Sequence, residues 1–140
     1  MPSVFSRIIA GELPAYFVWK NDQAVAFLSI NPLRPGHTLV VPRREIDHWL
    51  DLPPELLQHL THASQQIGAA LQRGFGAAKV GMMIAGLEVP HAHIHLVPIN
   101  TVHDMDFDRA EQHPAAGDLD EAARIIRREL RALGSPYVAD

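Results

Sequence analysis

Three histidines, His91, His93 and His95, stand at alternate positions in one short stretch of the chain. Side chains on a β-strand alternate between its two faces, so a strand would place all three imidazoles on one face. A helix would instead spread the three rings around its circumference. The other face of such a strand would be apolar and would point toward a core, because the residues there are Ala92, Ile94 and Leu96. We therefore expect a strand over 91–98 that presents three imidazoles in a row.

A row of imidazoles is compatible with three roles. It can be the solvated polar face of an edge strand. It can be a metal site, because neutral imidazole is a common metal ligand. A fourth histidine, His37, directly precedes the strand-like run Thr38–Pro42 and can join the row if the two strands are neighbours. The row can also supply a nucleophile or an acid–base group, because imidazole has an ordinary pKa of about 6.5. Spacing alone leaves the metal and catalytic roles open.

Length and composition limit the class of protein. With 140 residues, 47% of them hydrophobic, we expect one domain with a substantial core. A net charge of −4 predicts no bulk attraction to nucleic acid or to an anionic membrane. The sequence has neither a signal-peptide pattern nor an apolar run long enough for a membrane span, so we expect a cytoplasmic protein. The absence of cysteine excludes disulfides and thiolate zinc sites.

Apolar periodicity, capping residues and turn signals predict an alternation of short strands with one long helix and one C-terminal helix. The early connections are hairpin-like, which favours an α+β fold with a mainly antiparallel sheet. Residues 4–99 would form the core of this domain. In chain order, we expect a helix over 4–11, strands over 15–20, Ala24–Leu28 and Thr38–Pro42, a helix over 53–74, a strand over 80–85, the histidine strand, a loop or arm over 100–118, and a helix over 119–133.

Three blocks in a fixed order give the sequence a family resemblance. They read FSRIIAGELPA at 5–15, FLSINPLRPGHTLVVP at 27–42 and VPHAHIH at 89–95. Together they resemble the histidine triad (HIT) family, and the match runs from about Val4 to Ile99. The resemblance implies a five-stranded, mainly antiparallel sheet. It also implies a homodimer with a ten-stranded sheet, joined through the long helix and the strand before the triplet. Met82 would suit that interface, although it would equally suit a central core.

The resemblance implies a covalent phosphoryl reaction without a cofactor. The middle histidine, His93, would attack the α-phosphorus of a nucleoside phosphoramidate, an adenylated amine or a dinucleoside polyphosphate. Water would then release the nucleotide from a nucleotidyl-histidine intermediate. A backbone carbonyl would hold one nitrogen of His93 as a donor and leave the other free. His91 and His95 would orient His93 or donate to phosphate oxygens, and His37 would lie behind the row.

A purine nucleotide or nucleotide conjugate is the implied partner. By resemblance, Ser29 stands at the position that contacts the sugar, and the backbone amides of Glu88 and Val89 would face developing negative charge on the phosphoryl group. The residues that would line an apolar base pocket suit an ordinary core equally well. They are Val4, Phe5, Ile8, Phe27 and Ile30.

Several positions depart from the family pattern. Ser29 replaces the usual ribose-binding Asp, Ala85 replaces a common Asn, and Leu87 stands where a Gln often contacts the leaving group. The loop before the triplet is also shorter. Ser3 and Ser6 stand at the spacing of a cysteine pair that binds zinc in some bacterial members, so we expect no such zinc site. Two alternatives remain: a nucleotide-binding regulatory module with negligible turnover, and a metal-binding protein that uses the four histidines.

Overall fold

A computed structural model describes residues 1–140 and contains one five-stranded sheet with the strand order β1-β2-β3-β5-β4. Every neighbouring pair is antiparallel, so the predicted α+β fold with an antiparallel sheet is confirmed. The strands are β1 (Phe17–Lys20), β2 (Ala24–Leu28), β3 (Thr38–Pro42), β4 (Lys79–Met83) and β5 (Ile94–Ile99). The helices are α1 (Val4–Ile9), α2 (Pro54–Phe75) and α3 (Ala116–Ala132), with short 3-10 turns η1 (Trp49–Asp51), η2 (Val102–Met105) and η3 (Phe107–Arg109).

The histidine strand is shorter than predicted. It begins at Ile94, so His91 and His93 lie in the irregular segment that precedes β5. This segment is not paired with β3, because the Ala92 amide donates to the Ile46 carbonyl instead. The predicted alternation nevertheless holds, since Ala92 and Ile94 are buried in the main core while the histidines face the other side.

Several other boundaries also differ from the prediction. Strand β1 begins at Phe17 rather than at residue 15. The first helix ends at Ile9, and Gly11 follows with a φ of 84°, a conformation that glycine adopts easily. Strand β4 covers 79–83, so Ala85 lies beyond its end. The predicted arm over 100–118 contains η2 and η3, and α3 already begins at Ala116 rather than at 119.

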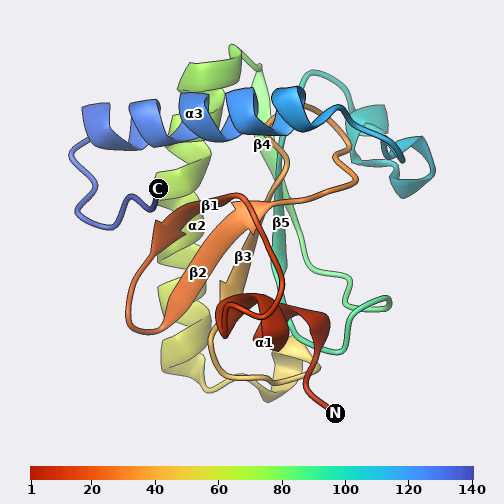
Figure 1. Cartoon of the computed structure of the whole chain (residues 1–140), viewed down its shortest axis with the longest axis vertical. Helices are drawn as coiled ribbons and strands as arrows, with labels where there is room; N and C mark the ends of the chain where they lie inside the picture. Colours follow the sequence, from red (N-terminus) through yellow and green to blue (C-terminus); the bar gives the residue numbers. More distant parts are fainter.

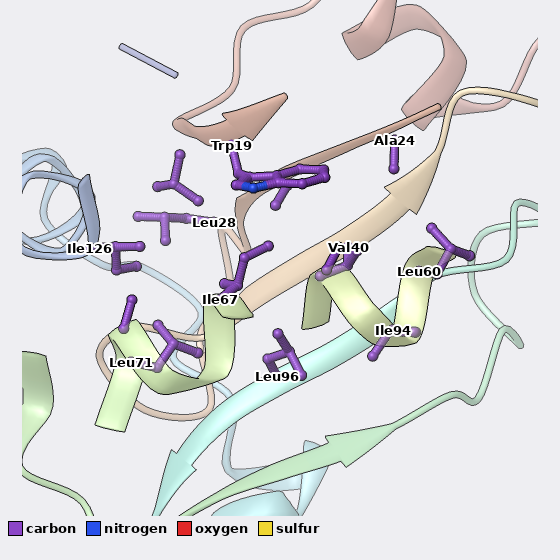
Figure 2. Packing of buried hydrophobic residues seen from close by; sticks show 14 of the residues in the cluster. Trp19, Ala24, Leu28, Val40, Leu60, Ile67, Leu71, Ile94, Leu96 and Ile126 are labelled. Carbon is purple, nitrogen blue, oxygen red and sulfur yellow. The ribbon is translucent and has the colours of Figure 1, made fainter. Parts of the chain in front are cut away.

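One side of the sheet carries the main core. Helices α2 and α3 cover this side and cross each other, as Figure 1 shows. A cluster of 21 buried residues fills the space between the helices and the sheet. Figure 2 shows Ile67 of α2 and Ile126 of α3 pointing toward Trp19 and Leu28 of the strands. The periodic apolar positions of the helices therefore do what their spacing predicts: they bury the helices against the sheet.

The other side of the sheet carries the histidines and is covered more thinly. A cluster of only five buried apolar residues lies there: Phe5, Val25, Phe27, Leu39 and Val41. Figure 1 shows α1 toward one end of the strands and the segment after β5 toward the other end. The histidine side is thus covered by a six-residue helix and by this segment, rather than by long helices.

Strand β4 forms an edge of the sheet, and its Met82 is 57% exposed, so Met82 is not part of a central core. None of the helices combines the length and apolar composition that crossing a membrane requires.

Candidate active site

The site is a row of rings that pack edge to face on the thinly covered side of the sheet. The Phe5 and His93 rings lie 4.8 Å apart, His93 and His95 also 4.8 Å, and His95 and Phe107 5.0 Å, all with edge-to-face geometry. His91, His93 and His95 are buried, with exposed fractions of 0%, 6% and 9%. Only the two latter rings therefore retain any surface through which a ligand can reach them.

His93 is held in one orientation by the backbone. Its Nδ1 lies 2.8 Å from the carbonyl oxygen of His91, which can only accept, so the proton of the neutral ring is on Nδ1. The lone pair is then on Nε2. Burial lowers the pKa of His93, which favours this neutral form. His93 is thus held as a neutral imidazole, with its Nδ1 bonded to a backbone carbonyl.

His37 lies directly behind His95 and determines where the proton of His95 sits. The Leu33 amide donates to Nδ1 of His37 at 3.0 Å, so the proton of His37 is on Nε2. That nitrogen donates to Nδ1 of His95 at 2.9 Å, which leaves the proton of His95 on Nε2. Burial, reinforced by the neighbouring imidazoles, lowers the pKa of His37 to about 3 and that of His95 to about 4. Both rings stay neutral at pH 7, and His95 keeps one N–H for a ligand.

Gly36 makes the close approach of His37 possible. Its φ is 96°, and a Cβ at this position would lie 2.7 Å from the Phe75 ring. Any side chain would therefore push the 34–37 turn away from α2 and move His37 relative to His95.

His91 has a different environment from the other two triplet histidines. Its Nε2 donates to the Pro42 carbonyl at 2.8 Å, and its Nδ1 accepts from the Ser3 hydroxyl at 2.7 Å. Both ring nitrogens are therefore used inside the protein, and the ring is not available to phosphate oxygens. The orienting role that we expected of His91 falls to its backbone carbonyl, which accepts from His93.

The residues expected to line a base pocket separate into two groups. Phe5 is buried between Phe27 and His93, with its ring 5.5 Å from that of Phe27. Ile8 is partly buried against the same cluster. Val4 and Ile30 are instead 41% and 64% exposed, so they are surface residues in this conformation. Phe5 and Phe27 therefore form an aromatic surface, while the Ile30 side chain is exposed to solvent.

The positions that depart from the family pattern lie outside the buried core. Ser29 is partly buried, and its hydroxyl accepts from the Asn31 amide at 3.3 Å. With Leu33 and His37, it lines a cleft of about 820 Å³. Leu87 is 94% exposed and Ala85 is also exposed, so neither side chain packs into the fold.

The segment before the triplet contains two amides without a backbone partner. Neither Glu88 nor Val89 donates its amide to a backbone carbonyl, while the Val89 carbonyl accepts from the His91 amide at 2.8 Å. The Glu88 carboxylate is close enough to raise the pKa of His93 slightly against the larger lowering caused by burial.

Two residues at the site were not identified from the sequence. Phe107 lies in the polar segment after β5 and packs its ring on His95. Glu45 follows β3 and accepts hydrogen bonds from the Ser3 amide and the Ser6 hydroxyl. Neither belongs to a periodic pattern. The one available signal was an aromatic residue in an otherwise polar stretch.

The donor atoms of the site do not fit a metal centre. Ser3 and Ser6, at the spacing of a zinc-binding cysteine pair, use their hydroxyls in hydrogen bonds to His91 and Glu45. The facing nitrogens of His37 and His95 are only 2.9 Å apart, too close to coordinate one ion between them at about 2.0–2.1 Å from each in a tetrahedral site. No cluster of three or more histidine, aspartate or glutamate side chains has the arrangement that a metal ion needs.

Comparisons with known proteins find similar sequences and structures. The HIT domain family model matches residues 10–102. An uncharacterized HIT-like protein of Mycobacterium tuberculosis is 32% identical, over 93% of this chain and 94% of that protein. The crystal structure of a Zn-bound histidine triad family protein from Mycobacterium smegmatis superimposes with a TM-score of 0.80 at 28% identity, covering 94% of this chain and 95% of that one.

Two relatives have names that state a hydrolytic activity. The bis(5'-nucleosyl)-tetraphosphatase (asymmetrical) of Schizosaccharomyces pombe is 30% identical, over 67% of this chain and 53% of that protein. The adenylylsulfatase HINT3 of Arabidopsis thaliana is 28% identical, over 68% of this chain and 51% of that protein. This chain therefore spans about half the length of each of these two enzymes.

Proposed function

The chain belongs to the HIT domain family, and on this premise we propose that it is a nucleotidyl hydrolase or transferase. Its substrate would be a nucleoside phosphoramidate, an adenylated amine or a dinucleoside polyphosphate, attacked at the α-phosphorus. The observation that carries the proposal is the bond from His93 Nδ1 to the His91 carbonyl, which leaves Nε2 as a free lone pair. Relatives named as hydrolases of nucleotide compounds support the substrate class.

In the first step, the Nε2 lone pair of His93 forms a bond to the α-phosphorus. The bond from phosphorus to the leaving nitrogen or oxygen breaks, and its electron pair departs with the leaving group, which takes a proton from solvent. The imidazole becomes a cation while it carries the nucleotidyl group. The His91 carbonyl accepts from Nδ1–H at 2.8 Å and so stabilises this positive charge.

In the second step, water attacks the phosphorus and the nitrogen–phosphorus bond breaks. Its electron pair returns to Nε2 of His93, the mononucleotide leaves, and the proton of the water passes to solvent. An alcohol or amine in place of water would give transfer instead of hydrolysis. The covalent route thus divides one difficult substitution into two easier ones.

Stabilisation of the phosphoryl charge falls to neutral donors. Nε2–H of His95 is the free end of the relay from Leu33 through His37, and it would donate to a phosphate oxygen. The amides of Glu88 and Val89 would add backbone donors from the other side. Because His37 and His95 have pKa values of about 3 and about 4, this donor set does not change its protonation near neutral pH.

A purine base would lie against Phe5, Ile8 and Phe27, with Ile30 closing over it from the exposed side. The active form would be a homodimer in which β4 pairs with β4 of a second copy and extends the sheet to ten strands. The exposed Met82 on this edge strand supports such pairing. A monomeric mass by light scattering at micromolar concentration would contradict the dimer.

The test is turnover of two substrates, an adenosine phosphoramidate and a dinucleoside polyphosphate, by protein prepared without a metal-affinity tag. Release of a mononucleotide from either substrate supports the proposal. Tight binding without turnover would instead favour a nucleotide-binding regulatory module, for which the departures at Ser29, Ala85 and Leu87 are the supporting observation. Dialysis against a chelator should leave phosphoramidate turnover unchanged, since imidazole is itself the nucleophile.

A further inference from the structure

A second polar cluster adjoins the nucleophile, and its side chains have no part in the reaction proposed above. It consists of Glu45, Ser3, Ser6 and His91. One oxygen of the Glu45 carboxylate accepts from the Ser3 amide at 2.5 Å and from the Ser6 hydroxyl at 2.7 Å. These hydrogen bonds lower the pKa of Glu45, that from the Ser3 amide most strongly, so the carboxylate is charged at neutral pH.

The bonds of this cluster have one consistent set of proton positions. His91 donates from Nε2 to the Pro42 carbonyl, so its Nδ1 must accept the proton of the Ser3 hydroxyl at 2.7 Å. The Ser3 oxygen in turn accepts from the Ser6 amide at 3.0 Å, which caps the N-terminus of α1. Ser3 therefore links the start of α1 to the ring of His91.

This cluster fixes α1 on the segment that carries the nucleophile. A helix of six residues is not stable by itself and needs contacts with the rest of the protein to hold it. Two such contacts join α1 to the triplet segment: the Ser3–His91 hydrogen bond and the packing of the Phe5 ring on the His93 ring, 4.8 Å away. Glu45 stabilises the Ser3–His91 contact by accepting a hydrogen bond from the backbone amide of Ser3.

The same residue, His91, supplies the carbonyl that orients His93. A change in the position of Ser3 would therefore reach the nucleophile by two routes, through the His91 carbonyl and through the Phe5 ring. Displacement of a reacting group by about 1 Å can cost about a hundredfold in rate.

We propose that Glu45 is a positioning residue for the nucleophile: through Ser3, Ser6 and His91 it fixes both the tautomer and the location of His93. The proposal rests on the function proposed above, in which His93 attacks phosphorus. Glu45 itself contacts neither the histidine rings nor, in this proposal, the substrate.

The test compares Glu45→Ala, Glu45→Gln and the matched control Asp47→Ala, an exposed carboxylate in the same link for which no side-chain hydrogen bond is present. We expect kcat/KM for an adenosine phosphoramidate to fall about tenfold to a hundredfold in Glu45→Ala. Glu45→Gln should recover most of the activity because an amide oxygen still accepts from both Ser3 and Ser6. Asp47→Ala should be within about twofold of the unsubstituted protein.

A second readout separates positioning from a merely structural role. Nitrogen NMR of the histidine rings reports which nitrogen carries the proton. In the unsubstituted protein, His93 should be protonated at Nδ1 alone, and in Glu45→Ala its two nitrogen signals should move toward each other as the tautomers mix. Circular dichroism should show that both variants keep their fold; if Glu45→Ala does not fold, Ser3→Ala takes its place in both measurements.

Equal kcat/KM and equal ring signals in Glu45→Ala and Asp47→Ala would overturn the proposal. A loss of activity with an unchanged His93 tautomer would overturn it as well, because Glu45 would then act only on the fold. If the unsubstituted protein turns over no phosphoramidate, the proposed function fails, while the nitrogen signals still decide whether Glu45 positions His93.

Discussion

The two sides of the sheet bury different kinds of side chain. On the side covered by α2 and α3, a cluster of 21 buried residues is apolar throughout. On the other side, only five apolar residues form a buried cluster, and the buried polar residues Ser3, His37, His91, His93 and His95 lie beside it. Burial of apolar surface stabilises a fold, whereas buried polar groups need partners for every hydrogen bond. The comparison indicates that one side supplies stability, while the other holds the polar groups on which the proposed reaction depends.

The largest effect should come from the chemical side. His93→Asn removes the proposed nucleophile but keeps a shorter side chain with hydrogen-bonding groups. Phosphoramidate turnover should fall by at least about 10²–10⁴-fold, the usual cost of removing a positioned proton-transfer group, since covalent catalysis is lost as well. Circular dichroism and thermal unfolding should change little. Equilibrium binding of the mononucleotide should persist, and turnover at a near-normal rate would show that His93 is not the nucleophile.

A substitution on the core side should instead lower stability and leave activity nearly unchanged. Ile126 of α3 is fully buried, and Ile126→Ala should lower the free energy of unfolding by about 2–5 kcal/mol. The kcat of the molecules that remain folded should stay within about twofold, because Ile126 is on the far side of the sheet from the histidines. Denaturant unfolding and active-site titration measure the two quantities. The exposed Asp120 on the same helix provides the control, as Asp120→Ala should change neither.

Protonation should also distinguish the two sides. His37 and His95 have folded-state pKa values of about 3 and about 4, below the ordinary value of 6.5. Between pH 6.5 and 4 the unfolded chain binds protons that the folded chain excludes, so stability is highest above pH 6.5 and falls as the pH is lowered through this range.

The urea midpoint at pH 7 and pH 5 measures this dependence. It should drop less between the two pH values in His37→Gln than in the unsubstituted protein, because one of the excluded protons is no longer involved. The exposed His103 serves as the control through His103→Gln. An equal drop in all three proteins would mean that the buried histidines do not govern the acid sensitivity.

The smallest effect should come from the sugar site. A carboxylate can accept from both ribose hydroxyls, and charge-assisted bonds are roughly twice as strong as neutral ones. Ser29 is neutral, so kcat/KM for ribo- and 2′-deoxyribonucleotide substrates should differ by only a few-fold. Ser29→Asp should increase this preference. A preference above about a hundredfold in the unsubstituted protein would show that another group holds the sugar.

The sequence predicted the repetitive parts of the molecule well. Short apolar runs bounded by turn signals identified β2 and β3 with the correct ends, and three ordered blocks identified the family, which the comparisons confirm. The start of β5 was placed three residues early because alternation continues through His91 and His93, where the backbone bonds to Ile46 instead of to β3. Local pattern does not reveal the partner of a backbone amide.

The contacts that define the site were harder to predict because they join distant parts of the chain. The relay from Leu33 through His37 to His95 depends on a turn whose geometry requires Gly36 beside Phe75. The two His91 ring nitrogens bond to the Pro42 carbonyl and to Ser3, which is 88 positions away. Phe107 reaches His95 from a segment without periodicity, so no sequence pattern marks it.

The most direct test of the account is the covalent intermediate on His93. Protein in steady-state turnover of an adenosine phosphoramidate is quenched in alkali, because a nitrogen–phosphorus bond is labile in acid, and the digest is analysed by mass spectrometry with fragmentation. We expect one nucleotidyl group on the peptide that contains the three histidines, located on His93 and absent from His93→Asn. Turnover without any such group, or a group located on His91 or His95, would contradict it.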